Sequence, residues 1–215
     1  MIEEVRRVIT EQDIPPRGVL HVPAGSLFTP SARDLARERF VEIVELAPED
    51  LARLARPETT IALGSDHGGF RLKERLKPVL DELGWTVRDV GVHEEKAVDY
   101  PDIACAVALL VAEGKAALGV VVDGAGIGSA MAANKVPGVR AALCYDRASA
   151  RNSREHNHAN VLTLGGRLLT ESQAEDVLRT WLATPFAGGR HQGRIDKITE
   201  IERRYSSWTP QNSKD

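Results

Sequence analysis

From residue 61 onward, short apolar runs alternate with amphipathic stretches. The apolar runs predict strands at 61–64, 86–90, 118–122, 139–144 and 161–165. Apolar positions three or four residues apart predict helices at 70–83, 102–113, 129–134, 147–156, 171–183 and 192–204. Alternation of this kind predicts the α/β class: a Rossmann-like, doubly wound sheet of five parallel strands with helices on its faces.

The first part of the chain has a different pattern. An amphipathic helix is expected at 1–11, and the Pro-Pro-Arg-Gly segment that follows breaks it. Strands are then expected at 19–22 and 41–46, separated by a helix at 30–40 that Thr29 caps.

These patterns divide the chain into three parts. We expect a small N-terminal α+β extension at 1–58, a main domain at 59–205 and a polar tail at 206–215. The extension is too small to hold a large core of its own. We therefore expect it to pack on the main domain or on a partner.

Composition excludes several classes of function. Of the 215 residues, 42% are hydrophobic and 27% are charged, which is ordinary for a globular protein. A net charge of −3 offers no general attraction to nucleic acid or to anionic membranes, and no apolar run is long enough to span a bilayer. Cys105 and Cys144 both lie in apolar runs, which predicts buried free thiols in a reducing compartment. With no secretory apolar segment at the N-terminus, we expect a cytoplasmic protein.

Polar and glycine-rich segments follow two of the predicted strands, where parallel sheets bind ligands. Asp66 and His67 follow the first strand, and Asp-Gly-Ala-Gly-Ile-Gly at 123–128 ends the third. Amides of such a glycine loop can converge on an anion. The alternatives are an Asx-type turn with a solvent-facing histidine and a tight strand-to-helix turn. A nucleotide-binding module is a weaker alternative, because its glycine motif belongs after the first strand.

Basic residues gather near the C-terminal part of the main domain. His156 ends a predicted helix, where it could act as a general acid or base or simply offset the helix dipole. Arg190 and Arg194 are four residues apart at a helix start and could bind one phosphate with Arg167, although surface charge is the alternative. Histidines without nearby cysteine or carboxylate ligands do not make a zinc site.

Together these segments resemble the type B ribose-5-phosphate isomerases and the related galactose-6-phosphate isomerases. The matching motifs occur in order: Gly-Ser-Asp-His-Gly-Gly-Phe at 64–70, Asp-Tyr-Pro-Asp at 99–102, Gly-Ala-Gly-Ile-Gly at 124–128, Ala-Ala-Asn-Lys at 132–135, Gly-Val-Arg-Ala at 138–141, Arg-Glu-His-Asn at 154–157, Gly-Gly-Arg at 165–167 and Gly-Gly-Arg-His-Gln-Gly-Arg-Ile at 188–195. Each motif is weak alone, but the ordered combination is highly specific.

The resemblance implies active sites that are assembled from two chains, in a homodimer or homotetramer, without a metal or cofactor. It implies that His156 opens the ring of a phosphorylated sugar. The remaining residues would bind that substrate: Asp66, His67 and Asn157 its hydroxyls, Arg167, Arg190, His191 and Arg194 its phosphate, and the amides of Gly124, Ala125, Gly126 and Gly128 the enediolate.

The chain departs from the family at the catalytic base. Many relatives carry cysteine just before the glycine loop, where this chain has Asp123, and another branch carries glutamate just after it, where this chain has Ser129. We interpret Asp123 as the base, because a buried carboxylate can perform this chemistry. We count Ser129 with Asp123 and His156 among the expected catalytic positions. The alternative is that Asp123 only caps the loop, in a protein with altered or lost activity.

We therefore predict an aldose–ketose isomerase of phosphorylated sugars, converting ribose 5-phosphate to ribulose 5-phosphate through a cis-enediolate, in pentose phosphate metabolism. The alternatives are a tetrose or hexose phosphate as substrate, or a non-catalytic phosphosugar-binding or scaffold protein. Residues 22–36 resemble segments in enzymes of bacterial microcompartments. This makes shell or cargo proteins candidate partners and the microcompartment interior a candidate location. An ordinary extension that packs on the domain or mediates oligomerisation is the alternative.

Overall fold

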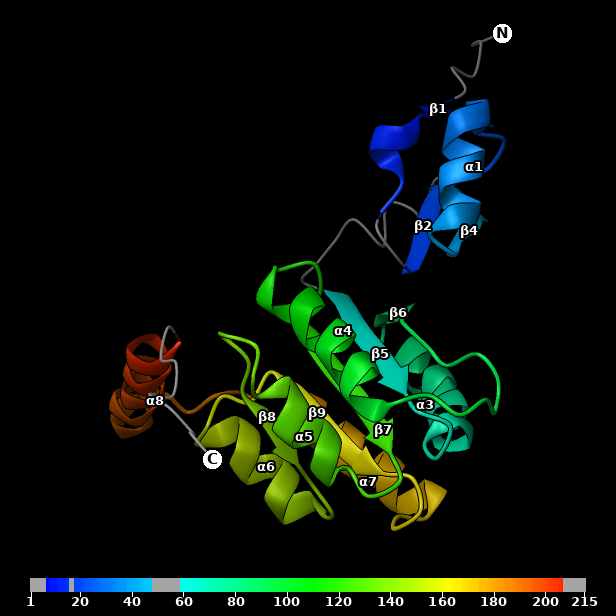
Figure 1. Cartoon of the computed structure of the whole chain (residues 1–215). Helices are drawn as coiled ribbons and strands as arrows, with labels where there is room; N and C mark the ends of the chain where they lie inside the picture. The colour runs from blue at the N-terminus through cyan, green and yellow to red at the C-terminus, as the bar shows by residue number, and fades with distance from the viewer. Residues whose placement is uncertain (1–6, 16–17, 48–58, 207–215) are drawn as a thin grey trace, which may run out of the picture. The chain divides into compact units, whose positions relative to one another are not determined.

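The chain folds into two compact units, Met1–Pro57 and Glu58–Asp215 (Figure 1). The structure is a computed structural model that describes residues 7–15, 18–47 and 59–206. The predicted polar tail therefore lies outside the described residues, apart from Ser206. None of the described helices is long and apolar enough to cross a membrane.

The second unit is built on a five-stranded parallel sheet with the strand order β6-β5-β7-β9-β8. Its strands are β5 (Thr60–Ser65), β6 (Thr86–Asp89), β7 (Leu118–Asp123), β8 (Ala141–Leu143) and β9 (Val161–Gly165). Every residue of β5, β7 and β9 is buried. Burial from both faces explains the continuous apolar runs, and the predicted doubly wound α/β fold is confirmed.

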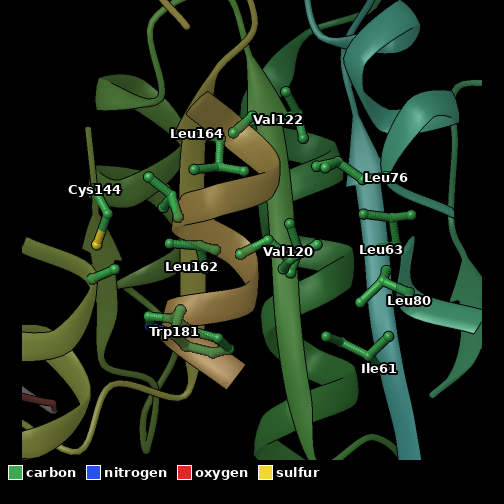
Figure 2. Packing of buried hydrophobic residues seen from close by; sticks show 14 of the residues in the cluster. Ile61, Leu63, Leu76, Leu80, Val120, Val122, Cys144, Leu162, Leu164 and Trp181 are labelled. Atoms are coloured by element: carbon green, nitrogen blue, oxygen red, sulfur yellow. The ribbon is translucent and has the colours of Figure 1, made fainter. Parts of the chain in front are cut away.

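Helices cover both faces of this sheet. They are α3 (Phe70–Glu82), α4 (Tyr100–Ala112), α5 (Ile127–Ala133), α6 (Arg147–Glu155) and α7 (Glu171–Ala183). The last helix, α8 (Gln192–Tyr205), follows the short helix η3 (Gly189–His191). One core packs Val120 and Val122 of β7 against α3 and α7, where Trp181 is fully buried (Figure 2). A second core packs Val121 against α4 and α5. Neighbouring side chains of β7 therefore pack into different cores, because successive side chains of a strand point to opposite faces of the sheet.

A buried charge cluster ties α3 to the end of β6. The side chain of Lys73 is fully buried, and its Nζ lies 2.7 Å from Oδ2 of Asp89 and 2.7 Å from the carbonyl oxygen of Val92. Nζ of Lys77 lies 2.5 Å from the same Asp89 oxygen. The cluster therefore fixes the start of the loop that leads from β6 to α4.

The first unit combines one α-helix with two short parallel sheets. Its elements are β1 (Val8–Ile9), η1 (Glu11–Asp13), β2 (Gly18–Pro23), β3 (Leu27–Phe28), α1 (Pro30–Glu38) and β4 (Val41–Leu46). β1 pairs with β3, and β2 pairs with β4. Thr29 caps α1 as predicted, because its side chain accepts a hydrogen bond from the amide of Ala32 at 3.2 Å.

Two local predictions are wrong. Val8 and Ile9 form a strand rather than part of the helix expected at 1–11, because pairing with β3 buries Ile9 completely; residues 1–6 of that helix lie outside the described residues. Cys105 is exposed rather than buried, whereas Cys144 is buried, and both are free thiols. Cys105 lies on the outer face of α4, because this helix turns Ala104, Val107 and Ala108 towards the sheet.

Candidate active site

The carboxyl ends of β5, β7 and β9 bring three predicted segments together. The amide of Asp66 donates to the carbonyl oxygen of Val122 at 3.2 Å, which joins the first loop to β7. The amide of Gly166 donates to the carbonyl oxygen of Asp123 at 2.7 Å. The amide of Arg167 donates to the carbonyl oxygen of Gly124 at 3.1 Å. Asp66, Asp123, the glycine loop and Arg167 therefore share one edge of the sheet.

Two glycines make this close approach possible. A Cβ atom at Gly69 would lie 2.1 Å from the carbonyl oxygen of Val122, so no other residue fits between the first loop and β7. Gly126 has a φ of 79°, a left-handed conformation that glycine adopts without strain. The glycine-rich sequences at these positions are thus needed for the loops to meet.

Asp123 is held by the glycine loop that follows it. The residue is only 4% exposed, and its Oδ1 accepts hydrogen bonds from the amide of Ala125 at 2.8 Å and from the amide of Gly126. Its Oδ2 accepts hydrogen bonds from the amide of Ser129 at 3.0 Å and from the Ser129 hydroxyl. In this conformation Asp123 has the geometry of a loop-capping acid, the alternative that the sequence left open.

The loop amides of Ala125 and Gly126 have a partner within the chain in this conformation. The amides of Ala125 and Gly126 were expected to stabilise an enediolate, but here they donate to Asp123. They are thus unavailable to a substrate oxygen while Asp123 keeps this position. The amides of Gly124 and Gly128 are not among the donors to Asp123.

Asp66 accepts fewer hydrogen bonds at its carboxylate than Asp123 does. The residue is 7% exposed, and its Oδ1 accepts a hydrogen bond from the amide of Gly69 at 2.9 Å. Its Oδ2 has no hydrogen-bond partner among the described residues. His67 follows it with an exposed side chain. Both residues can therefore meet a ligand at this edge.

Tyr100 lies beside the glycine loop, a contact that the sequence analysis missed. Its ring lies against the end of the glycine loop, because a Cβ atom at Gly128 would be 2.5 Å from two of its ring carbons. The residue is 41% exposed. The Asp-Tyr-Pro-Asp motif was a usable signal, since it matched the family, but no property of the motif alone predicts a contact with residue 128.

A second cluster of predicted site residues lies at the end of α6 and the start of α8. It consists of His156, Asn157, Arg190, His191 and Arg194. The rings of His156 and His191 are stacked, with centroids 4.2 Å apart and planes 6° from parallel. Burial lowers the pKa of His191, and the charges of His156, Arg190 and Arg194 lower it further. Within the described ranges, no group of three or more His, Cys, Asp or Glu residues could hold a metal ion.

The two clusters lie at opposite ends of β9. Residues 157–160 lead into this strand at Val161, whereas Gly166 and Arg167 follow its last residue, Gly165. A strand of this length spans about 13–16 Å. A single chain therefore brings Asp66, Asp123 and Arg167 together, but it keeps them apart from His156, Arg190 and Arg194.

Similar proteins cover the second unit. The family model described as Ribose/Galactose Isomerase matches residues 61–198. Ribose-5-phosphate isomerase B of Escherichia coli (strain K12) is 43% identical over 144 residues, which are 67% of this chain and 97% of that protein. The structure of Clostridium thermocellum ribose-5-phosphate isomerase B is 48% identical, with a TM-score of 0.67, over 68% of this chain and 99% of that chain. The structure of Mycoplasma genitalium ribose-5-phosphate isomerase B with bound ribulose-5-phosphate is 41% identical, with a TM-score of 0.65, over 67% of this chain and 96% of that chain.

Proposed function

Because the chain belongs to the Ribose/Galactose Isomerase family, we propose that it interconverts ribose 5-phosphate and ribulose 5-phosphate. One observation supports this most directly: Asp66, Asp123, the glycine loop and Arg167 meet at one sheet edge. This edge offers carboxylates for proton transfer, amides for a developing oxyanion and a guanidinium for a phosphate. Relatives named ribose-5-phosphate isomerase B share the fold.

The reaction needs two proton-transfer stages. In ring opening, the bond between C1 and the ring oxygen breaks, the ring oxygen gains a proton and the anomeric hydroxyl loses one. In isomerisation, a base removes the proton from C2 to form a cis-enediolate and returns it to C1, while a proton passes from O2 to O1. We assign the first stage to His156 and the second to Asp123.

For Asp123 to act as the base, Ser129 has to release Oδ2 when the sugar binds, because four donors occupy the carboxylate in this conformation. Once Asp123 has taken the C2 proton, it is neutral and a weaker acceptor. Negative charge develops at the same time on the enediolate. The loop amides that held Asp123 then become donors for that charge, as an oxyanion hole requires.

A second copy of the chain would complete the site. The separation of the two clusters along β9 supports this, because a partner can present His156, Arg190 and Arg194 to the Asp123 edge. Apolar side chains stand exposed near both clusters. On α5 these are Ile127 and Met131, and on α8 they are Ile198, Ile201 and Tyr205. The α8 residues line a groove of about 650 Å³, so both surfaces suit a homodimer.

A coupled assay of ribulose 5-phosphate formation tests the proposal. The intact protein should turn over ribose 5-phosphate, and Asp123→Asn should lose turnover while it still binds the sugar phosphate. Asp123→Cys is the matched control, since it restores the residue of many relatives and should keep activity. Thermal unfolding of each variant shows whether it is folded.

Other outcomes would redirect the assignment. Full turnover in Asp123→Asn would leave Asp123 as a loop cap and make Asp66→Asn the next variant. An intact protein that is inactive on ribose 5-phosphate, and on tetrose and hexose phosphates, would exclude the isomerase and leave a phosphosugar-binding role.

For residues 1–58 we propose only a docking or oligomerisation role, because they lie outside the matched range of 61–198. The microcompartment hypothesis rests on the resemblance of residues 22–36, and its expected first helix is absent at Val8 and Ile9. A deletion of residues 1–58 that keeps turnover but loses co-sedimentation with shell proteins would support it. Without such docking, the proposed location is the cytoplasm.

A further inference from the structure

Asn152 connects two residues of the second cluster. It lies on α6, four residues before His156, so the two side chains share one face of the helix end. Its Nδ2 is 2.9 Å from Nδ1 of His156. Its Oδ1 is 3.3 Å from Nδ2 of Asn157. Asn152 precedes the Arg-Glu-His-Asn motif, and neither the motifs nor the proposed mechanism gives it a role.

The direction of these hydrogen bonds follows from one backbone group. Nδ2 of Asn157 also lies 3.3 Å from the backbone carbonyl oxygen of Asn152, which can only accept. The NH2 group of Asn157 therefore faces Asn152 and donates to its Oδ1 as well. This leaves the NH2 group of Asn152 facing His156, so Nδ1 of His156 has to accept. The proton of the neutral imidazole is then on Nε2.

The surroundings of His156 fit this tautomer. Its Nε2 is 3.8 Å from a carboxylate oxygen of Glu155, an acceptor that a ring N–H can face in the free protein. Its face is stacked on His191. One contact in the ring plane and one on its face leave the imidazole little freedom to rotate.

We propose that Asn152 is a positioning residue that holds His156 in the Nε2–H tautomer, so that Nε2–H is the group offered to the ring oxygen of the sugar. The inference rests on the proposed isomerase function for its catalytic meaning. It also fixes the role of Asn157. Since its NH2 group is engaged by Asn152, only its Oδ1 is available to a substrate, where it accepts from a hydroxyl.

Asn152→Asp and Asn152→Leu test this in the full-length protein. Aspartate has the same size but presents only acceptors, so it should move the proton of His156 to Nδ1. Leucine removes the hydrogen bond and should give a mixture of tautomers. The ¹⁵N NMR shifts of the ring nitrogens report the tautomer, with His156→Gln used to assign them. Arg151→Gln, at the neighbouring exposed position, is the matched control and should change nothing.

The kinetic readout separates positioning from simple capping of α6. For Asn152→Asp we expect kcat to fall about 10-fold or more with a small change in KM, because a histidine in the wrong tautomer loses catalysis more than binding. An Nε2–H tautomer that persists in Asn152→Asp, or an unchanged kcat in an active enzyme, overturns the inference. If the intact protein is inactive, the proposed function fails, yet a tautomer change in Asn152→Asp still supports the assignment of Asn152.

Discussion

Ser129 donates two hydrogen bonds to one oxygen of Asp123, from its amide at 3.0 Å and from its hydroxyl. The family resemblance places cysteine at the position of Asp123 in many relatives and glutamate at the position of Ser129 in others. This chain therefore holds a bonded Asp–Ser pair where relatives hold one base or the other. The pair is a specific arrangement of this chain, and its two members can be tested separately.

Ser129→Ala should destabilise the protein without abolishing turnover. A buried hydrogen bond to a carboxylate contributes about 1.5–3 kcal/mol, so the free energy of unfolding should fall by an amount of this order. Because the substitution removes the hydroxyl donor and leaves only the amide of residue 129 on Oδ2, kcat should be kept or raised. Urea unfolding and the coupled assay measure both effects, with Ser172→Ala, at an exposed position of α7, as the control. A large loss of kcat at unchanged stability would show instead that Ser129 acts directly on the substrate.

Lys73→Met should be among the most destabilising substitutions in the second unit. It leaves the carboxylate of Asp89, whose side chain is only 14% exposed, without its fully buried partner. Loss of one member of a buried pair costs about 3–5 kcal/mol. Lys77→Met, at a side chain that is 31% exposed, should cost much less. Equal losses in the two variants, measured by urea unfolding, would contradict this ranking.

Acid should weaken the same cluster. Burial by itself raises the pKa of Asp89, but the hydrogen bonds from Lys73, Lys77 and the amide of Gly91 outweigh it and hold the pKa below its usual 3.8. A carboxylate whose pKa is lowered by folding stabilises the folded state at pH values above its pKa in the unfolded chain. This contribution is lost as the pH falls through the pKa of the folded state and the carboxylate binds a proton. The free energy of unfolding should therefore fall as pH drops from about 5 towards 3. Asp89→Asn should show a flatter slope over this range, and an identical slope would exclude Asp89 as the cause.

Gly69→Ala and Gly124→Ala should differ sharply in stability. The added Cβ atom would lie 2.1 Å from a backbone oxygen at residue 69, but 3.7 Å from the flexible side chain of Arg167 at residue 124. A backbone clash forces the sheet edge to move, and overpacking costs about 1–3 kcal/mol or more. Thermal unfolding should show a large loss for the first variant and a small change for the second. A reversed order would mean that the first loop does not pack on β7 in solution.

Mixing two inactive variants should restore activity. If each site takes Asp123 from one chain and His156 from the other, a hybrid of Asp123→Asn and His156→Gln contains one intact site and one doubly damaged site. Random pairing of equal amounts should then give about a quarter of the wild-type activity. The variants are denatured together, refolded and assayed, with each variant refolded alone as the control. No recovery from well-folded hybrids would place the complete site within one chain.

Much of the fold could be predicted, because strands that are buried on both faces of the sheet appear in the sequence as continuous apolar runs. Helix α7 begins and ends where the sequence predicts, at Glu171 and Ala183. The two residues of β1 show the limit. A strand this short has no periodicity of its own, and only its pairing with Leu27 and Phe28 explains why Val8 and Ile9 are extended.

The candidate site could be predicted as a set of residues but not as an arrangement. Strand order places Asp66 and Asp123 at one edge, since Asp66 follows β5 and Asp123 ends the neighbouring parallel strand β7. The four donors around Asp123 and the bond from Asn152 to His156 depend on how loops and side chains turn, which no sequence period encodes. Tyr100 is a similar case, because its contact with Gly128 joins two elements that are distant along the chain.

The length of β9 has a consequence for how turnover depends on protein concentration. With the acid-bearing edge at one end and the His156 cluster at the other, an isolated chain carries every group of the proposed site and still cannot assemble it. If a second copy completes the site, as proposed, turnover per chain obeys mass action and should decline on dilution below the dissociation constant of the pair. Added substrate, by bridging the two halves, should shift that threshold to lower protein concentration.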